Sequence, residues 1–163
     1  MKFQHCLLAI AICSSSLFAQ EDSPKSDDKK PATPLIEFRK AWYEKEEGRI
    51  ASDFKQNGKQ LYLEPKAQIT EADVKSIKLE ADDQVPNLNQ ITIVLTDEGA
   101  KKMRTLTKEH LQHPLAILME GKVVVAPIIR EQIAGHIRID GLDSKKEAES
   151  LVAEIQKQID ERD

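Results

Sequence analysis

The chain has 163 residues, with 28 Asp and Glu against 24 Lys and Arg, and its formal net charge is −4. This mild acidity, with both charge signs mixed along the chain, argues against nucleic acid or an anionic lipid surface as the main partner. The two cysteines, Cys6 and Cys13, both lie in the first nineteen residues. A domain formed by the remaining residues has no disulfide and must be held by its core alone.

The first nineteen residues predict a secretory signal peptide. Lys2 is followed by an apolar stretch from Cys6 to Ala19, which is interrupted by three serines and is shorter than the roughly 20 residues needed to span a bilayer. We expect cleavage after Ala19, which places the protein outside the cytoplasm, periplasmic or secreted, with no integral membrane segment afterwards. The alternatives are an uncleaved anchor and a lipid on Cys13, although Ile12 is bulky where lipoprotein processing prefers a small side chain.

Residues 20–34 predict a disordered linker. The stretch QEDSPKSDDKKPATP contains three prolines and both charge signs but no large apolar residue. Such a segment buries too little surface to offset the entropy lost on ordering. The composition changes at Leu35, where we expect the folded domain to begin.

The first part of this domain predicts three strands and a short helix. One strand is expected at 36–39, and a second around Leu61 and Leu63, which share one face. Thr70 has an acid three residues later, as in a capping box, and Val74 and Ile77 follow at helical spacing. We therefore expect a short helix that leads into a strand at 76–81.

Residues 90–114 predict a strand followed by a longer helix. In QITIVLT the odd-numbered positions from Ile91 to Leu95 share an apolar face. Thr96 is the expected N-cap, with two acids in the first turn where the helix dipole favours negative charge. Pro114 marks the exit. The apolar stripe expected to face the core consists of Ala100, Met103, Leu106 and Leu111.

The final third predicts a hairpin, a strand and a terminal helix. The hairpin LAILMEGKVVVAP turns at Glu120-Gly121, where glycine can adopt the positive φ of a tight turn, and both apolar arms are expected to be covered on both faces. A strand follows with Ile137 and Ile139 inward. The elements together predict an α+β fold, a largely antiparallel sheet with helices packed on one face. The terminal helix is expected to begin with a capping box at Ser144 and Glu147 and to bury Ala148, Leu151, Val152, Ile155 and Ile159.

We find no pattern that indicates catalysis or a metal. His110 and His113 are three residues apart, but Pro114 follows directly and no third ligand has matching spacing, so we expect two solvated residues at a helix end. No Gly-x-Ser-x-Gly or Ser-x-x-Lys arrangement occurs, and the glycines stand singly, which argues against a phosphate-binding loop. We expect no enzyme activity, no cofactor and no metal site.

Three runs of the sequence resemble a known family. They are ITIVLTDEGAKKMRTLTKEH, PLAILMEGKVVVAP and IRIDGLDSKKEAESLVAEI, and they lie within roughly residues 61 to 159. In order and spacing they are similar to the head subdomain of the first large periplasmic domain of SecD, a subunit of the bacterial protein-export translocase. The matching positions are Glu98-Gly99-Ala100, Glu120-Gly121, Ala126-Pro127, Ile139-Asp140-Gly141 and Glu147-Ala148.

The chain also departs from this family. We expect neither the transmembrane helices nor the base subdomain of SecD, and Glu120 stands where the family usually has Asp. Without membrane helices, the chain would have no place for a proton pathway. Stand-alone exported proteins with this head and an N-terminal extension are similar as well, because a strand like 36–39 precedes one like 61–63 in them. We therefore place the domain at residues 35–163.

The resemblance implies a non-enzymatic domain whose partner is protein, in particular exported or unfolded polypeptide. A free sheet edge can add an extended segment as an extra strand, and a proline favours an edge position for its strand. The alternatives are that this hairpin is simply core, or that the domain is an accessory module docking on one envelope partner through its helices. The oligomeric state has no signal in the sequence. The candidate binding residues are Val123, Val125, Ala126, Pro127, Ile128 and Ile129, and the structural turns and caps are Thr96, Gly99, Gly121, Gly141, Ser144 and Glu147.

Overall fold

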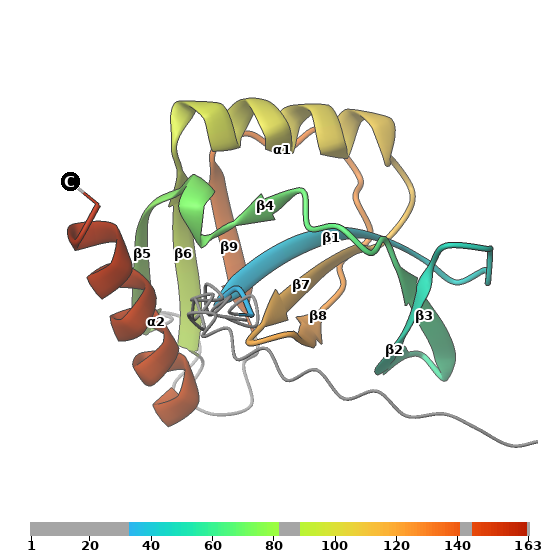
Figure 1. The fold of residues 1–163 in the computed structure, drawn as a ribbon, viewed down its shortest axis with the longest axis horizontal. Coiled ribbons are helices and arrows are strands. Elements are labelled where there is room, and N and C mark those ends of the chain that lie inside the picture. Colours follow the sequence, from blue (N-terminus) through green and yellow to red (C-terminus); the bar gives the residue numbers. More distant parts are fainter. Residues whose placement is uncertain (1–32, 82–88, 141–144, 163) are drawn as a thin grey trace, which may run out of the picture. The chain divides into compact units, whose positions relative to one another are not determined.

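A computed structural model describes residues 33–81, 89–140 and 145–162. The predicted signal peptide, the linker up to residue 32, Gly141 and Ser144 lie outside these ranges, as does the side chain of Glu147. The described residues form nine strands, two α-helices and one short 3-10 helix, arranged in two antiparallel sheets (Figure 1).

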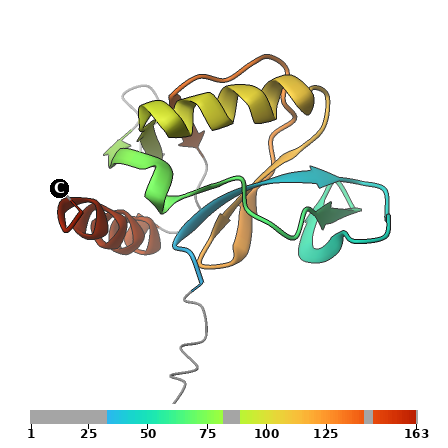
Figure 2. The same cartoon turned by 45° about the horizontal axis from the view of Figure 1, so that its top comes forward.

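The larger sheet has six strands and includes both strands of the candidate hairpin. Its order is β2-β3-β1-β7-β8, with the short β4 paired to β1 beside β3, and every pairing is antiparallel. Figures 1 and 2 both show the β2–β3 hairpin at the opposite end of the domain from the C-terminal helix. The strands are β1 (Ile36–Trp42), β2 (Ile50–Gln56), β3 (Lys59–Leu63), β4 (Ile69–Thr70), β7 (Leu115–Met119) and β8 (Lys122–Val125).

The smaller sheet has the order β5-β6-β9, again antiparallel throughout. Helix α2 packs against β5, and α1 lies close to β6, to β4 and to the 3-10 helix η1. These observations confirm the α+β class and the antiparallel pairing, with two sheets in place of one. The elements are η1 (Glu71–Asp73), β5 (Val74–Ala81), β6 (Asn89–Leu95), α1 (Asp97–Glu109), β9 (His136–Asp140) and α2 (Lys145–Asp160).

Two clusters of buried side chains lie on opposite faces of the larger sheet. The main cluster joins one face of β1 and β7 to the smaller sheet and both helices, and it includes Phe38, Ile91 and Met103. In strand β7 the alternate residues belong to a second cluster, because successive side chains of a strand point to opposite faces. This second cluster consists of Ala41, Leu61, Leu63, Ala116, Leu118 and Ala126, with Tyr43, Phe54 and Val123 packed against it.

Most predicted elements are confirmed. Strand β9 alternates exposed and buried residues, with Ile137 and Ile139 inward, and Ile91, Ile93 and Leu95 of β6 are buried. Four of the five residues predicted for the terminal helix face are buried, and Val152 packs against them half-buried. One-sided burial imposes a period of two on the apolar residues of strands and about 3.6 on those of helices. The spacing of apolar residues therefore predicts these elements.

Three predictions are wrong. Val74 and Ile77 belong to strand β5, and only the 3-10 helix η1 precedes them; its capping box between Thr70 and Asp73 is present as predicted. Leu111 is 42% exposed, because α1 ends before it, at Glu109. His110, expected in solvent, is 3% exposed.

Strand β2 was not predicted. Its turn carries the Asn-Gly signature of a tight hairpin: Asn57 and Gly58 have φ of 52° and 74°. The hairpin brings β2 to one end of the larger sheet, which matters for the site described below.

Candidate functional site

The β7–β8 hairpin has the tight turn that the sequence predicts. Glu120 and Gly121 both have positive φ, 48° and 79°, which matches the twist of the two strands. The amide of Glu120 donates a hydrogen bond to the carbonyl of Leu35 (3.0 Å), so the start of the domain is fixed to this turn. All five residues of β7 are buried, whereas the valines of β8 are only half-buried.

Strand β8 is the last strand of its sheet, and its outer edge has no strand paired to it within the described ranges. The first strand in the order, β2, lies beside β8 without pairing, so the sheet curls until its two ends face each other. A cavity of about 480 Å³ lies between them. Its lining includes Phe54 of β2, Val123 of β8, and Leu63 and Leu118 from the second cluster.

The segment after β8 turns back toward the end of α1. The amide of Leu115 donates to the carbonyl of Pro127 (2.9 Å), and the amide of Ile129 donates to the carbonyl of His113 (3.0 Å). Pro127 is exposed and Ile128 is half-buried, beside a recess of about 220 Å³.

The six predicted binding residues therefore divide into two groups. Ala126 and Ile129 are core residues, 0% and 2% exposed, so their side chains cannot meet a partner. The remaining four are accessible to different extents and lie along β8 and just beyond it: Val123, Val125, Pro127 and Ile128.

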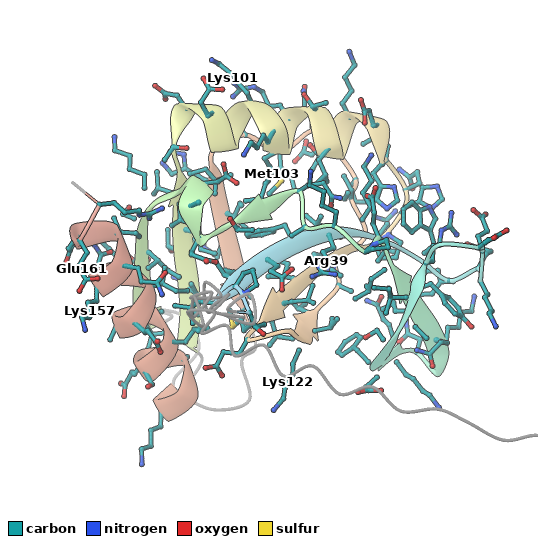
Figure 3. All side chains as sticks on the ribbon, viewed as in Figure 1. Arg39, Lys101, Met103, Lys122, Lys157 and Glu161 are labelled. Atoms are coloured by element: carbon teal, nitrogen blue, oxygen red, sulfur yellow. The ribbon has the colours of Figure 1, made fainter. Side chains whose placement is uncertain are left out.

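The cavity floor contains a buried ion pair. Glu37 and Arg39 lie two residues apart on β1 and therefore on one face of it, and Glu37 is 2% exposed. The guanidinium of Arg39 donates to Glu37 Oε2 through Nε (2.8 Å) and through Nη2, and to the carbonyl of Pro65 through Nη1 (2.7 Å). Figure 3 shows Arg39 on β1 and Lys122 at the hairpin end of the sheet. The cavity lining combines apolar side chains, among them Phe54 and Leu118, with the exposed charged residues Asp53 and Lys122.

Of the predicted turns and caps, Thr96, Gly99 and Gly121 lie in the described ranges. Thr96 Oγ1 accepts a hydrogen bond from the amide of Gly99 (3.0 Å), as an N-cap should. Gly99 also allows a close approach of α1 to η1, because a Cβ at this position would lie 2.5 Å from the carbonyl oxygen of Asp73. The amide of Thr96 donates to the same carbonyl (2.9 Å). The glycine of the Glu-Gly-Ala motif is thus required by packing.

His110 caps the C-terminus of α1 against the end of β1. Its Nε2 lies 2.9 Å from the carbonyl oxygen and 3.2 Å from the amide nitrogen of Ala41. Trp42 contacts the ring edge-on, with centroids 4.7 Å apart, and His113 stacks on it at 4.9 Å. Burial lowers the pKa of His110 below its usual value, and the nearby charges of His113 and Lys40 act in the same direction.

Acid is expected to destabilise the domain through His110. Because the folded pKa is lowered, the neutral ring is favoured in the native state, and this contribution is complete above the unfolded pKa of about 6.5 and lost as pH falls through the folded pKa. Between about pH 7 and pH 5, the free energy of unfolding should fall more in the wild type than in His110→Gln. Urea unfolding at each pH measures both falls. Equal losses in both proteins would contradict this role of His110.

Neither a metal centre nor a membrane helix is found in the described residues. Among them, no three His, Cys, Asp or Glu side chains are grouped so that they could hold a metal ion. No helix in the same ranges is both long enough and apolar enough to cross a bilayer.

Comparison with known proteins identifies the family. A family model described as the SecDF P1 head subdomain matches residues 45–157. The protein translocase subunit SecDF of Thermus thermophilus is 40% identical over 63 residues, which are 38% of this chain and 9% of that protein. The subunit SecD of Acidaminococcus fermentans is 36% identical over 90 residues, which are 55% of this chain and 21% of that protein.

Two solved structures agree with these matches. A crystal structure of SecDF in a super-membrane-facing form has a TM-score of 0.59 at 25% identity, covering 77% of this chain and 19% of that one. A second structure, described as a membrane component SecDF that enhances protein export, has a TM-score of 0.57 at 23% identity. The match covers 77% of this chain and 63% of that one and supports the fold alone. The chain spans 9% and 21% of the length of the two curated relatives above. Because the family model covers well over half of its residues, the chain belongs to the SecDF P1 head subdomain family.

Proposed function

We propose that this protein is a non-enzymatic, extracytoplasmic domain that binds extended polypeptide segments along the free edge of β8. The observation that carries the proposal is the position of β8, half-buried and unpaired on its outer side in the described part of the chain. Proteins that match parts of this chain are named protein translocase subunits, and this supports a polypeptide as the partner. The location rests on the predicted cleavage after Ala19, which an N-terminus at Gln20 in the exported protein would test.

Strand addition explains how such a domain could bind many sequences. The main-chain groups of an added segment pair with the exposed amides and carbonyls of the edge, which requires little of the partner's sequence. Side chains on one face of the added strand then contact the sheet surface, where Val123 and Ile128 offer apolar area. The result is broad selectivity with a preference for extended, partly apolar segments.

Val123→Lys is expected to weaken binding of unfolded chains about tenfold or more. The substitution replaces apolar contact area of β8 with a charge, and natural sheets use lysine on edge strands to discourage added strands. Loss of a buried valine contact is worth about 1.5–3 kcal/mol, and 1.4 kcal/mol corresponds to a factor of ten in affinity. Fluorescence anisotropy with a panel of reduced, carboxymethylated proteins measures the change.

Val94→Lys is the matched control for this experiment. Val94 is also a half-buried strand valine, but β6 is paired on both edges, to β5 and to β9, so it cannot accept another strand. Circular dichroism confirms that both variants fold. Unchanged affinity in Val123→Lys, or an equal loss in both variants, would rule out β8 as the binding edge.

A second candidate function is docking on one envelope partner through the helices. The observation that favours it is a groove of about 720 Å³ between α1 and the segment that follows β3. Lys102 and Asp73 (2.6 Å) and Lys40 and Glu109 (3.2 Å) form salt bridges between residues that line it. Recovery of a single stoichiometric partner after cross-linking in cells, with no affinity for the unfolded panel, would favour this function over the first.

A further inference from the structure

Strands β2 and β8 are the two unpaired ends of one curled sheet, and they face each other across the 480 Å³ cavity. The edge strands of a sheet usually face solvent, where each exposes a row of unpaired amides and carbonyls. Here the two rows are brought together, and a single extended segment could pair with both. An added strand with two neighbours forms hydrogen bonds along both of its edges, whereas a strand added to one edge forms them along one.

The present spacing leaves no room for that strand without movement of β2. Neighbouring strands lie about 4.7–4.9 Å apart, so a segment between β2 and β8 needs roughly 10 Å between them. Several Cα atoms of β2 lie within 8 Å of β8. Strand β2 would therefore have to move away from β8 by a few ångströms.

The hairpin is attached in a way that permits this movement. In the described ranges β3 pairs with β1 at Leu63 and Tyr62, next to a hydrogen bond from the amide of Glu64 to the carbonyl of Lys40 (2.9 Å). Tyr43 Oη donates to Gln56 Oε1 of β2 (2.7 Å), and the β2–β3 register shifts between Ala51 and Lys55. No residue of β2 is fully buried, and Phe54 is its one side chain packed against the second cluster in the described structure. Displacement of β2 with Leu61 and Leu63 of β3 kept in the second cluster exposes little apolar surface, and a bound chain covers it again.

The cavity walls define the chemistry of the occupant. Because side chains of a strand alternate between its two faces, every second residue of an inserted segment would point into the cavity. Phe54, Leu63 and Leu118 supply apolar lining, and the guanidinium of Arg39 is already bound to Glu37 and Pro65. The charged lining residues Asp53 and Lys122 are exposed. Apolar side chains at alternate positions fit this lining better than charged ones.

We propose that β2 and β8 are the two walls of a slot, into which an extended segment with alternating apolar residues inserts as a strand paired to both. This inference rests on the proposed function and names the substrate class and the movement that admits it.

A reversible cross-link between β2 and β8 tests the slot. Asp53→Cys and Lys122→Cys place thiols at two exposed positions that line the cavity from opposite sides. The full chain is used with Cys6 and Cys13 replaced by serine, and a short bifunctional methanethiosulfonate joins the two thiols. The same protein treated with a monofunctional methanethiosulfonate carries similar bulk but leaves β2 free to move.

The probes are two ten-residue peptides of the same composition, one with alternating apolar and polar residues and one with the apolar residues in a block. The cross-linked protein should bind the alternating peptide at least tenfold more weakly than the monofunctionally labelled protein, and reduction should restore binding. The alternating peptide should bind at least tenfold more tightly than the block peptide to the uncross-linked protein.

The outcomes separate the slot from the proposed function. Equal binding of the alternating peptide by the cross-linked and free forms overturns the slot while leaving polypeptide binding in place. Equal binding of the two peptides overturns the alternating occupant. Absence of binding to both peptides and to the unfolded panel, in every form of the protein, overturns the proposed function and the slot together.

Discussion

Arg39→Met is expected to destabilise the domain by roughly 3–5 kcal/mol, because it leaves the carboxylate of Glu37 buried without its partner. Glu37 is 2% exposed, and Arg39 donates two hydrogen bonds to it. The variant also loses the hydrogen bond to the carbonyl of Pro65 (2.7 Å). Urea unfolding with linear extrapolation measures the change in free energy of unfolding.

The double variant Glu37→Met with Arg39→Met serves as the control. Replacing both members of a buried ion pair by apolar residues of similar size is often neutral, whereas removing one is costly. The double variant should therefore recover most of the stability lost in Arg39→Met. A single variant that loses less than about 1 kcal/mol, or a double variant no more stable than the single one, would show that Glu37 does not depend on Arg39.

Gly99→Ala is expected to cost about 2 kcal/mol and to lower the melting temperature by roughly 5–10 °C. The added Cβ would lie 2.5 Å from the carbonyl oxygen and 2.9 Å from the Cβ of Asp73, so η1 and α1 must move apart. That carbonyl also accepts the hydrogen bond from the amide of Thr96. Alanine is the better helix former by up to about 1 kcal/mol, and the clash outweighs this gain. Thermal and urea unfolding both measure it.

Gly58→Ala separates the clash from the general effect of replacing a glycine. Gly58 has a φ of 74°, and nothing lies within 4 Å of the Cβ that alanine would add. The substitution should cost roughly 1–2 kcal/mol, because alanine is strained in the left-handed conformation. It leaves the α1–η1 contact intact. If Gly99→Ala proves as stable as the wild type, the close approach of α1 to η1 is not the reason for a glycine in this motif.

Much of the fold could be predicted because many elements bury one face and expose the other. Strands β6 and β9 and helix α2 bury regular stripes, and their caps and turns are marked by residues such as Thr96 and Gly121. The error at β5 has a local cause. The β5–β6 register shifts between Val74 and Ser76, and this irregularity turns both Val74 and Ile77 inward at a spacing that otherwise indicates a helix.

The candidate site was only half predictable for a different reason. The arm after Gly121 is strongly apolar and was identified, but the burial of Ala126 and Ile129 depends on pairing with residues near Pro114 at the end of α1. The opposite wall was missed because β2 has no fully buried residue and its sequence IASDFKQ does not alternate between apolar and polar residues, although Asn57-Gly58 marked its turn. Long-range pairing decides both features, and no local pattern encodes it.

The bond between Leu35 and Glu120 also determines how the domain can be presented to other molecules. Thr33 lies against Gly121, so the chain enters the domain at the tip of the hairpin whose second strand is β8. A group attached directly at Thr33 would therefore lie beside this edge. A fusion partner, surface or bead coupled at that residue would crowd the approach to β8, whereas coupling through residue 162 would leave that approach clear.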